Sequence, residues 1–193
     1  MAELAEADRR RALVHVEYSA VWALKDGVLR RAFGGGDAEA YAAWLQQQAE
    51  GQLAAAVNNT GLAYGLYRDL ALGSGLDSAE VKGDPGLFIT GASLGAPPDA
   101  FARSGQVWGL PPMNPLELEA RGFEPFRALL AANMRHAGMI RIDHVLGMAR
   151  QFWVPQGAAG ADGTYMTIPL EVMAAIIALE SQRARCMVIG EEL

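Results

Sequence analysis

Two short strand-like segments joined by one helix limit the fold of this chain more than any other feature of its sequence. Residues 186–189 form a continuous apolar run, which is typical of a strand buried on both faces. Residues 139–143 form a second strand candidate. The segment from Pro169 to about Arg185 has the pattern of a helix, with the proline and Glu171 in its first turn. A strand, a helix and a strand in this order predict neighbouring parallel strands in an α/β fold.

The remaining sequence extends this alternation and adds a long irregular segment. Apolar residues at helical spacing predict helices at about residues 3–24, 37–57 and 125–137, and partial alternation predicts a strand at 62–70. Residues 71–118 contain eight glycines and six prolines and show no sustained period. Such a segment is usually functional or disordered, and its aromatic residues argue against disorder. We therefore expect a long loop insertion here.

The alternation of strands and helices fits both a closed barrel and an open doubly wound sheet. No Gly-x-Gly-x-x-Gly turn follows a strand candidate, which argues against the dinucleotide-binding form of the open sheet. The histidines and the single cysteine, Cys186, lack the spacing of metal ligands, and no Gly-x-Ser-x-Gly elbow or phosphate loop is present.

Charge and hydropathy indicate the compartment and exclude two kinds of partner. The formal net charge of −6 leaves no basic surface for nucleic acid. No apolar run reaches the roughly 18 residues that a membrane span needs, and the first residues lack the apolar core of a signal peptide. One cysteine permits no internal disulfide, which favours a reducing compartment. The sequence therefore predicts a soluble, cytoplasmic protein.

Asp143 and Glu191 are the candidate catalytic pair. Asp143 stands at the C-terminal end of the first strand candidate, and Glu191 stands just beyond the second. Neighbouring strands are about 4.8 Å apart, so these carboxyl groups can lie roughly 5–6 Å from each other. Retaining glycosidases place their nucleophile and acid/base about 5–5.5 Å apart. The spacing alone fits equally a helix cap or a solvated loop acid, which is the commoner role of an acid after a strand.

Residues near this pair strengthen the catalytic interpretation. Arg141 lies two residues before Asp143, so both point to the same face of a strand, and the guanidinium would keep the carboxylate ionised. A structural salt bridge is the alternative. His144 is a candidate donor to a sugar hydroxyl, although a packed or surface histidine is the commoner case.

Three aromatic residues are candidate platforms for a sugar ring. Trp108 stands in a glycine-flanked loop, where its ring could stack on the apolar face of a pyranose. Phe101 and Tyr67 are the other two candidates. For Trp108 the alternative is a loop anchor that packs on the core.

Six short strings occur in a fixed order between residues 65 and 193. They are GLYRDLA at 65–71, GAPPD at 95–99, GQVWGLPP at 105–112, RIDH at 141–144, FWVP at 152–155 and GEEL at 190–193. Together they resemble the 4-α-glucanotransferases of glycoside hydrolase family 77. RIDH alone is also similar to the wider α-amylase clan, whereas GQVWGLPP is much more specific to family 77.

The resemblance implies a fold and a domain arrangement. It implies a partial (β/α)8 barrel that covers roughly the third to fifth strands, with both ends of the enzyme missing. Residues 1–60 would be a helical segment before the third barrel strand. Residues 61–193 would be the central part of the catalytic barrel, including the insertion at 71–118. About three barrel strands cannot close a barrel, so two edges of the sheet would be exposed. These edges could lead to self-association.

The resemblance also implies an activity. The chain would belong to an enzyme that transfers α-1,4-glucan segments between maltooligosaccharides by retaining double displacement, with neither a metal nor an organic cofactor. Asp143 would be the nucleophile and Glu191 the acid/base, with Arg141 supporting the nucleophile. The sugar-contacting positions would be Asp77, Asp99, Phe101, Gln106, Trp108 and His144.

Two other functions stay open. The alternatives are a glucan-binding fragment without turnover and an α-amylase-clan hydrolase.

The sequence departs from the family pattern at several places. The family uses a third carboxylate on a later strand, which is absent from these 193 residues, so the chain alone is expected to be nearly inactive. Lys82 replaces a usual tryptophan, and Glu192 replaces a usual aspartate.

Overall fold

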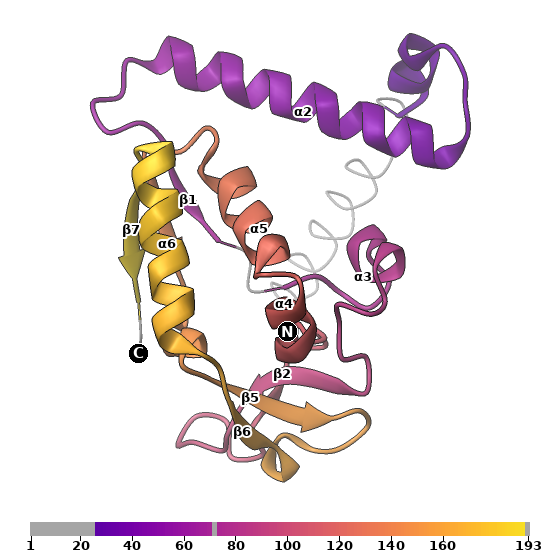
Figure 1. Ribbon diagram of the computed structural model, residues 1–193. Coiled ribbons are helices and arrows are strands. Elements are labelled where there is room, and N and C mark those ends of the chain that lie inside the picture. Colours follow the sequence, from indigo (N-terminus) through magenta and orange to yellow (C-terminus); the bar gives the residue numbers. More distant parts are fainter. Residues whose placement is uncertain (1–25, 71–72, 192–193) are drawn as a thin grey trace, which may run out of the picture. The chain divides into compact units, whose positions relative to one another are not determined.

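The computed structural model describes residues 26–70 and 73–191 (Figure 1). The chain divides into two compact units, Met1–Asn59 and Thr60–Leu193. The helix predicted at residues 3–24 lies outside the described residues. Within the described ranges, no helix has both the length and the apolar character that crossing a membrane requires.

The first unit contains two helical segments separated by a glycine run. Residues 26–33 are helical, and the glycines at 34–36 have φ angles of 83°, 115° and 138°, which residues with a side chain rarely adopt. Helix α2 then spans Ala38–Thr60. The Asp37 carboxylate caps it by accepting a hydrogen bond from the backbone N–H of Ala40 at 2.8 Å. The helix predicted to begin after Asp37 is therefore confirmed.

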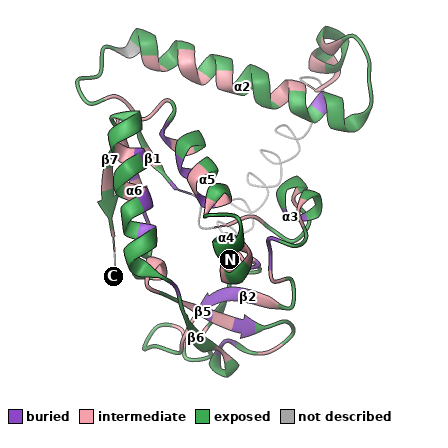
Figure 2. Ribbon diagram, viewed as in Figure 1, coloured by how far each residue is buried: buried purple, intermediate pink, exposed green. Residues whose placement is uncertain are grey.

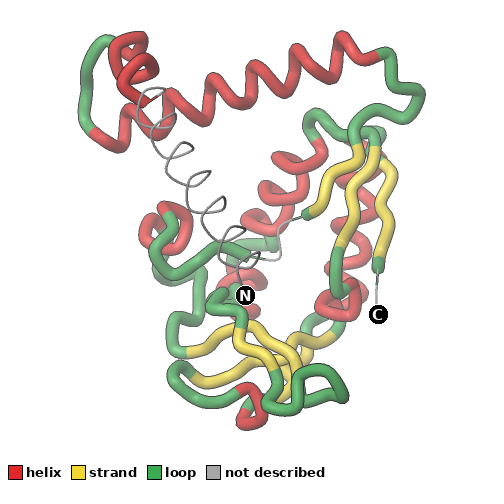
Figure 3. Tube along the Cα trace, turned by 180° about the vertical axis from the view of Figure 1, so that it is seen from behind, coloured by secondary structure: helices red, strands yellow, loops and turns green. Residues whose placement is uncertain are grey.

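A parallel sheet of three strands organises the second unit (Figure 3). The strands are β1 (Tyr67–Asp69), β4 (Met139–Ile142) and β7 (Met187–Gly190), in the order β1-β4-β7. The predicted parallel pair is confirmed, because β4 and β7 are hydrogen-bonded neighbours. On its other side β4 pairs with β1, also in parallel. All three strands therefore present their C-terminal ends at one edge of the sheet.

Helices α5 (Glu124–Met134) and α6 (Leu170–Ala184) cover one face of this sheet (Figure 1). Side chains alternate along β4, so Ile140 and Ile142 are buried while Arg141 points to the opposite face. The buried core that the helices and the sheet share contains Leu70, Leu130, Met134, Ile140, Ile142, Met173, Ile176 and Cys186, among others. The apolar face thus fixes β4 in the orientation that presents its polar residues on the other side.

Truncating Leu130 is expected to destabilise the second unit. This α5 side chain is 0% exposed, so Leu130→Ala should lower the free energy of unfolding by about 2–5 kcal/mol, the range for large-to-small core substitutions. The matched control is Leu116→Ala, whose side chain is 76% exposed and whose loss should cost less than about 0.5 kcal/mol. Urea unfolding followed by circular dichroism measures both. Equal losses in the two variants would contradict the packing described here.

The second unit also contains an antiparallel sheet of four strands. Its strands, in spatial order, are β3 (Gln106–Val107), β2 (Ala92–Ala96), β5 (Arg150–Pro155) and β6 (Thr164–Thr167). The remaining short elements of the second unit are α3 (Ala79–Gly83), α4 (Pro115–Ala120) and the 3-10 turns η1 (Val145–Met148) and η2 (Gly160–Asp162).

The expectation of a loop without regular structure at 71–118 is wrong. This segment supplies two strands of the antiparallel sheet and two short helices. Gly95 allows two strands of this sheet to lie close together, since a Cβ on Gly95 would lie 2.1 Å from the backbone oxygen of Gln106. Strand β2 pairs with β5, and local periodicity cannot reveal a partner so distant in the sequence.

The strand predicted at 62–70 is too long, and the burial predicted for the strand at 186–189 is wrong. Only residues 67–69 of the first are paired as a strand. Strand β7 is not buried on both faces, because Met187 is 55% exposed (Figure 2). Among the described residues, β7 pairs only with β4, and Met187 and Ile189 on one of its faces are both exposed.

Candidate active site

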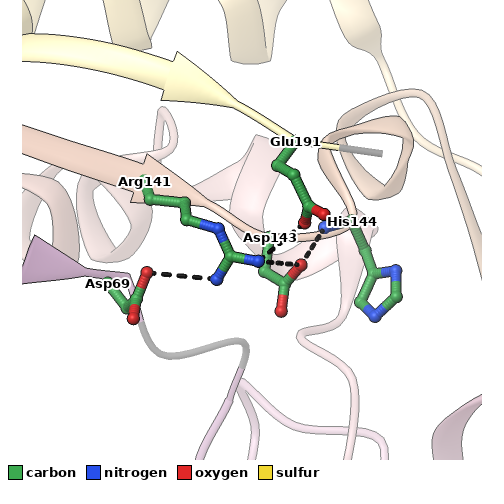
Figure 4. Close-up of polar contacts among 5 residues, drawn as sticks. All are labelled: Asp69, Arg141, Asp143, His144 and Glu191. Carbon is green, nitrogen blue, oxygen red and sulfur yellow. Dashed lines mark hydrogen bonds and ion pairs between the residues drawn. The ribbon is translucent and has the colours of Figure 1, made fainter. Parts of the chain in front are cut away.

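The C-terminal edge of the parallel sheet gathers four charged side chains (Figure 4). Asp69 is the last residue of β1, Arg141 lies within β4, and Asp143 directly follows β4. Glu191 directly follows β7. Strand order therefore brings together residues that are up to 122 positions apart in the sequence (Asp69 and Glu191), as parallel α/β sheets do with their functional groups.

The guanidinium of Arg141 lies at the centre of this cluster (Figure 4). Its Nη2 donates to Asp143 Oδ1 at 3.2 Å and to Glu191 Oε2 at 2.8 Å. Its Nη1 donates to Asp69 Oδ1 at 3.2 Å. One nitrogen thus bridges the two candidate catalytic carboxyl groups, while the other is held by a third carboxylate. These contacts are charge-assisted hydrogen bonds, which are stronger than neutral ones.

The two candidate catalytic carboxyl groups have opposite pKa shifts. Their mutual hydrogen bond lowers the pKa of Asp143, and the charges of Arg141 and His144 lower it further. The same hydrogen bond raises the pKa of Glu191 above its usual range, with partial burial acting in the same direction. The opposite directions of these shifts mean that Asp143 loses its proton at a lower pH than Glu191 does. Glycoside chemistry uses such a difference between two carboxyl groups, one as nucleophile and one as acid.

Both candidate carboxyl groups contact the same nitrogen of Arg141. The strand spacing of about 4.8 Å predicts that the two groups lie roughly 5–6 Å apart. Their shared contact with one cation agrees with the predicted placement at the C-terminal ends of neighbouring parallel strands.

His144 joins this cluster to the antiparallel sheet. Its backbone adopts a left-handed conformation with φ of 48°, and its N–H donates to Asp143 Oδ1 at 3.1 Å. Its ring stacks on Trp108, with ring centroids 5.2 Å apart and an interplanar angle of 24°. The Trp108 indole N–H donates to Gln106 Oε1 at 3.0 Å. Three of the predicted sugar-contacting residues therefore form one chain of contacts that starts at Asp143.

The other predicted sugar-contacting residues have different surroundings. The carboxylate of Asp77 is fully exposed and lies 3.1 Å from the ammonium of Lys82, the residue that departs from the family pattern. Asp99 caps its own turn by accepting hydrogen bonds from the N–H groups of Phe101 and Ala102. The Phe101 ring is fully exposed, and Tyr67 is half exposed on β1. The interactions that the structure shows for these residues are local and do not include the carboxylate cluster.

A mostly apolar cavity of about 260 Å³ lies beside β4. Ile142, Phe126, Met173, His144 and Trp108 are among the residues that line it. Because side chains alternate along β4, Arg141 points to the face opposite Ile142. The four charged residues of the cluster are therefore not part of the cavity lining, whereas His144 and Trp108 are.

Asp69 is the cluster residue that sequence reasoning did not single out. It falls in the GLYRDLA string, but a charged residue at the end of a three-residue strand has no distinctive local pattern. The one sequence feature that could have indicated Asp69 is its position at the C-terminal end of a strand. Once β1 is placed beside β4, Asp69 stands opposite Arg141 in the register.

Comparisons with known proteins agree on one family. The family model described as 4-alpha-glucanotransferase, glycoside hydrolase family 77, matches residues 35–193. The chain is 49% identical over 154 residues to a 4-alpha-glucanotransferase of Haemophilus influenzae, a match that covers 78% of this chain and 22% of that protein. The chain thus spans about a fifth of the length of this relative.

Solved structures give the same assignment. The crystal structure of amylomaltase from Corynebacterium glutamicum matches with a TM-score of 0.75 and 39% identity, over 79% of this chain and 22% of that one. An amylomaltase from Streptococcus agalactiae, solved in complex with acarbose, shares the fold with a TM-score of 0.64 and 23% identity, over 86% of this chain and 36% of that one. With the match over residues 35–193, these similarities show that the chain belongs to the 4-alpha-glucanotransferase family, glycoside hydrolase family 77.

Proposed function

We propose that this chain is the central catalytic part of a retaining 4-α-glucanotransferase, with Asp143 as nucleophile and Glu191 as acid/base. The observation that carries the proposal is the bridge from one nitrogen of Arg141 to both carboxyl groups, at the C-terminal ends of neighbouring parallel strands. The opposite pKa shifts of the two groups support the division of roles. Family membership supports the substrate class.

In the first chemical step, the Asp143 carboxylate attacks the anomeric carbon of the donor glucan. A bond forms between Asp143 and that carbon while the bond to the glycosidic oxygen breaks. Glu191 gives its proton to the departing oxygen, so the leaving half of the glucan gains a 4-hydroxyl group. Arg141 stabilises the negative charge on Asp143 before attack and the charge that develops on Glu191 as it loses its proton.

In the second step, another sugar takes the place of the leaving half. Glu191, now a carboxylate, removes the proton from the 4-hydroxyl of this acceptor. The hydroxyl oxygen bonds to the anomeric carbon, and the bond to Asp143 breaks. Both carboxyl groups return to their starting states, and the α configuration is retained after two inversions.

The proposed architecture is a partial (β/α)8 barrel. Strands β1, β4 and β7 would be consecutive barrel strands, with the antiparallel sheet as an insertion after β1 and residues 1–60 as a segment before the barrel. Active sites of such barrels lie at the C-terminal ends of the strands, where the carboxylate cluster is found. Since three strands cannot close a barrel, we infer that the 193-residue chain alone has little or no activity.

The proposed substrates are maltooligosaccharides. Gln106, Trp108 and His144 would contact the sugar nearest the carboxylates, since they form one chain of contacts ending at Asp143. Asp77, Asp99 and the exposed ring of Phe101 would contact more distant sugars. The acarbose complex of the Streptococcus agalactiae protein supports a carbohydrate ligand.

A chimera provides the test of this function. Residues 35–193 of this chain, which the family model matches, replace the corresponding segment of the Haemophilus influenzae relative, and the chimera is incubated with maltotriose. Chromatography should show glucose together with oligosaccharides longer than maltotriose. Reducing ends without longer products would indicate a hydrolase, and sugar binding without products would indicate a binding module. The unmodified chain, assayed beside it, should give little or no product.

The pH dependence of the chimera should follow from the two shifted carboxyl groups. Transfer requires an ionised Asp143, so activity is lost as the pH falls through a pKa that lies below the usual aspartate range. It also requires a protonated Glu191, so activity is lost as the pH rises through a pKa above the usual glutamate range. A plot of kcat/KM against pH should therefore be bell-shaped. An alkaline limb at or below the ordinary glutamate pKa would contradict the assigned roles.

A further inference from the structure

Asp69 contacts the catalytic cluster only through Arg141. Its carboxylate accepts from Arg141 Nη1 at 3.2 Å, whereas Nη2 of the same guanidinium serves Asp143 and Glu191. Figure 4 shows these three carboxylates around one cation. The backbone reinforces the placement, because the N–H of Leu70 donates to the carbonyl oxygen of Arg141 at 2.8 Å. β1 is thereby fixed beside the catalytic strand at the level of Asp69.

We propose that Asp69 is a positioning residue that holds Arg141 by Nη1 and offsets part of its positive charge, so that Glu191 retains the proton needed for catalysis. The inference rests on the proposed function for its catalytic meaning. Its physical content is a charge balance among the groups facing this site: Arg141 and His144 on the cationic side, and Asp69, Asp143 and Glu191 on the acidic side.

The positive charge of Arg141 is shared among three carboxylates. Asp69 is the largest contributor to the raised pKa of Arg141, ahead of both catalytic carboxyl groups. Arg141 in turn acts to lower the pKa of Asp143 and of Glu191. Removing the negative charge of Asp69 leaves the whole guanidinium charge to the catalytic pair. Glu191 would then lose its proton at lower pH, and less of the enzyme would carry the acid at neutral pH.

A role in folding alone predicts a different result. The Asp69 side chain is 71% exposed, and exposed ion pairs contribute little to stability. Asp69→Asn should therefore leave the unfolding transition nearly unchanged while it alters the titration of Glu191. This separation between stability and titration is what a positioning residue requires.

The test is a titration of the 193-residue chain, followed by 13C NMR of the side-chain carboxyl groups. In Asp69→Asn, the titration midpoint of Glu191 should move to lower pH by about half a pH unit relative to the unchanged chain. In Asp69→Glu, which keeps the charge, it should move much less. The matched control is Asp84→Asn, which removes one carboxylate from the exposed cluster of Arg121 with Asp84 and Glu117. It should leave Glu191 unaffected.

Two outcomes would overturn the inference. A Glu191 midpoint that stays in place or moves to higher pH in a folded Asp69→Asn chain contradicts the charge balance, and so does an equal shift in Asp69→Glu. The chimera gives the second readout, since the alkaline limb of its pH profile should move in the same direction in Asp69→Asn. If the chimera has no transfer activity while the NMR shift is present, the proposed function fails and the charge effect of Asp69 stands.

Discussion

Replacing Asp143 by asparagine in the chimera is expected to reduce transfer from maltotriose by about a thousandfold or more, the scale for loss of a covalent nucleophile. Asparagine has nearly the same shape, but its amide cannot form the glycosyl–enzyme bond. It can still accept hydrogen bonds from Arg141 and from the backbone of His144, so the cluster should keep its geometry. Rates come from chromatography of the products, and binding of maltooligosaccharides comes from titration calorimetry.

Sugar binding should survive this substitution, because Trp108 and Gln106 are untouched and His144 keeps its position. Asp84→Asn is again the matched control, since it makes the same chemical change in an arginine ion pair that lies outside the carboxylate cluster. A chimera with Asp143→Asn that retains a tenth or more of the original rate would show that the nucleophile lies elsewhere.

Replacing Glu191 by glutamine has the second large expected effect, and that effect depends on the leaving group. With maltotriose, the variant should be slower by about 10²–10⁴-fold, the range for loss of general acid–base catalysis. With α-maltosyl fluoride as donor, the first step should be largely restored, because fluoride leaves without needing a proton. The second step should stay slow, because no base activates the acceptor hydroxyl. Fluoride release followed with an ion-selective electrode should therefore show a burst.

The contrast between the two donors separates acid/base catalysis from a structural role. A general loss of fold would lower the rate of the first step equally with both donors, and circular dichroism would detect the unfolding. Arg141 cannot take over the role of the acid in maltotriose cleavage, because its guanidinium does not give up a proton near neutral pH. A first step with maltosyl fluoride, measured as the fluoride burst, that is slowed as much as maltotriose cleavage would contradict the assignment of Glu191.

Local sequence patterns were sufficient to predict the sheet edge that carries Arg141, Asp143 and Glu191. The apolar run at 186–189 and the strand at 139–142 are joined by one helix, and such units place their strands side by side in parallel. Period-two alternation then put Arg141 and Asp143 on one face. The convergence of both carboxyl groups on one guanidinium could not be predicted from spacing, because it depends on side-chain conformations.

The antiparallel sheet and Asp69 depend on contacts between distant parts of the sequence. Strand β2 pairs with β5, and Asp69 pairs with Arg141, 72 positions away. Neither relation leaves a periodic signal in its own segment. The exposure of β7 was mispredicted for a related reason, since an apolar run shows that a strand can be buried but not which of its faces other elements cover.

The most direct test of the central claim is to identify the residue that carries the glucosyl group. The chimera with Glu191→Gln is incubated with α-maltosyl fluoride, digested with a protease at low pH and analysed by tandem mass spectrometry. The intermediate should accumulate, since its formation needs no acid and its breakdown needs the missing base. The account predicts a maltosyl group on Asp143. A maltosyl group on another residue such as Asp69, or rapid fluoride release with no labelled peptide, would contradict it.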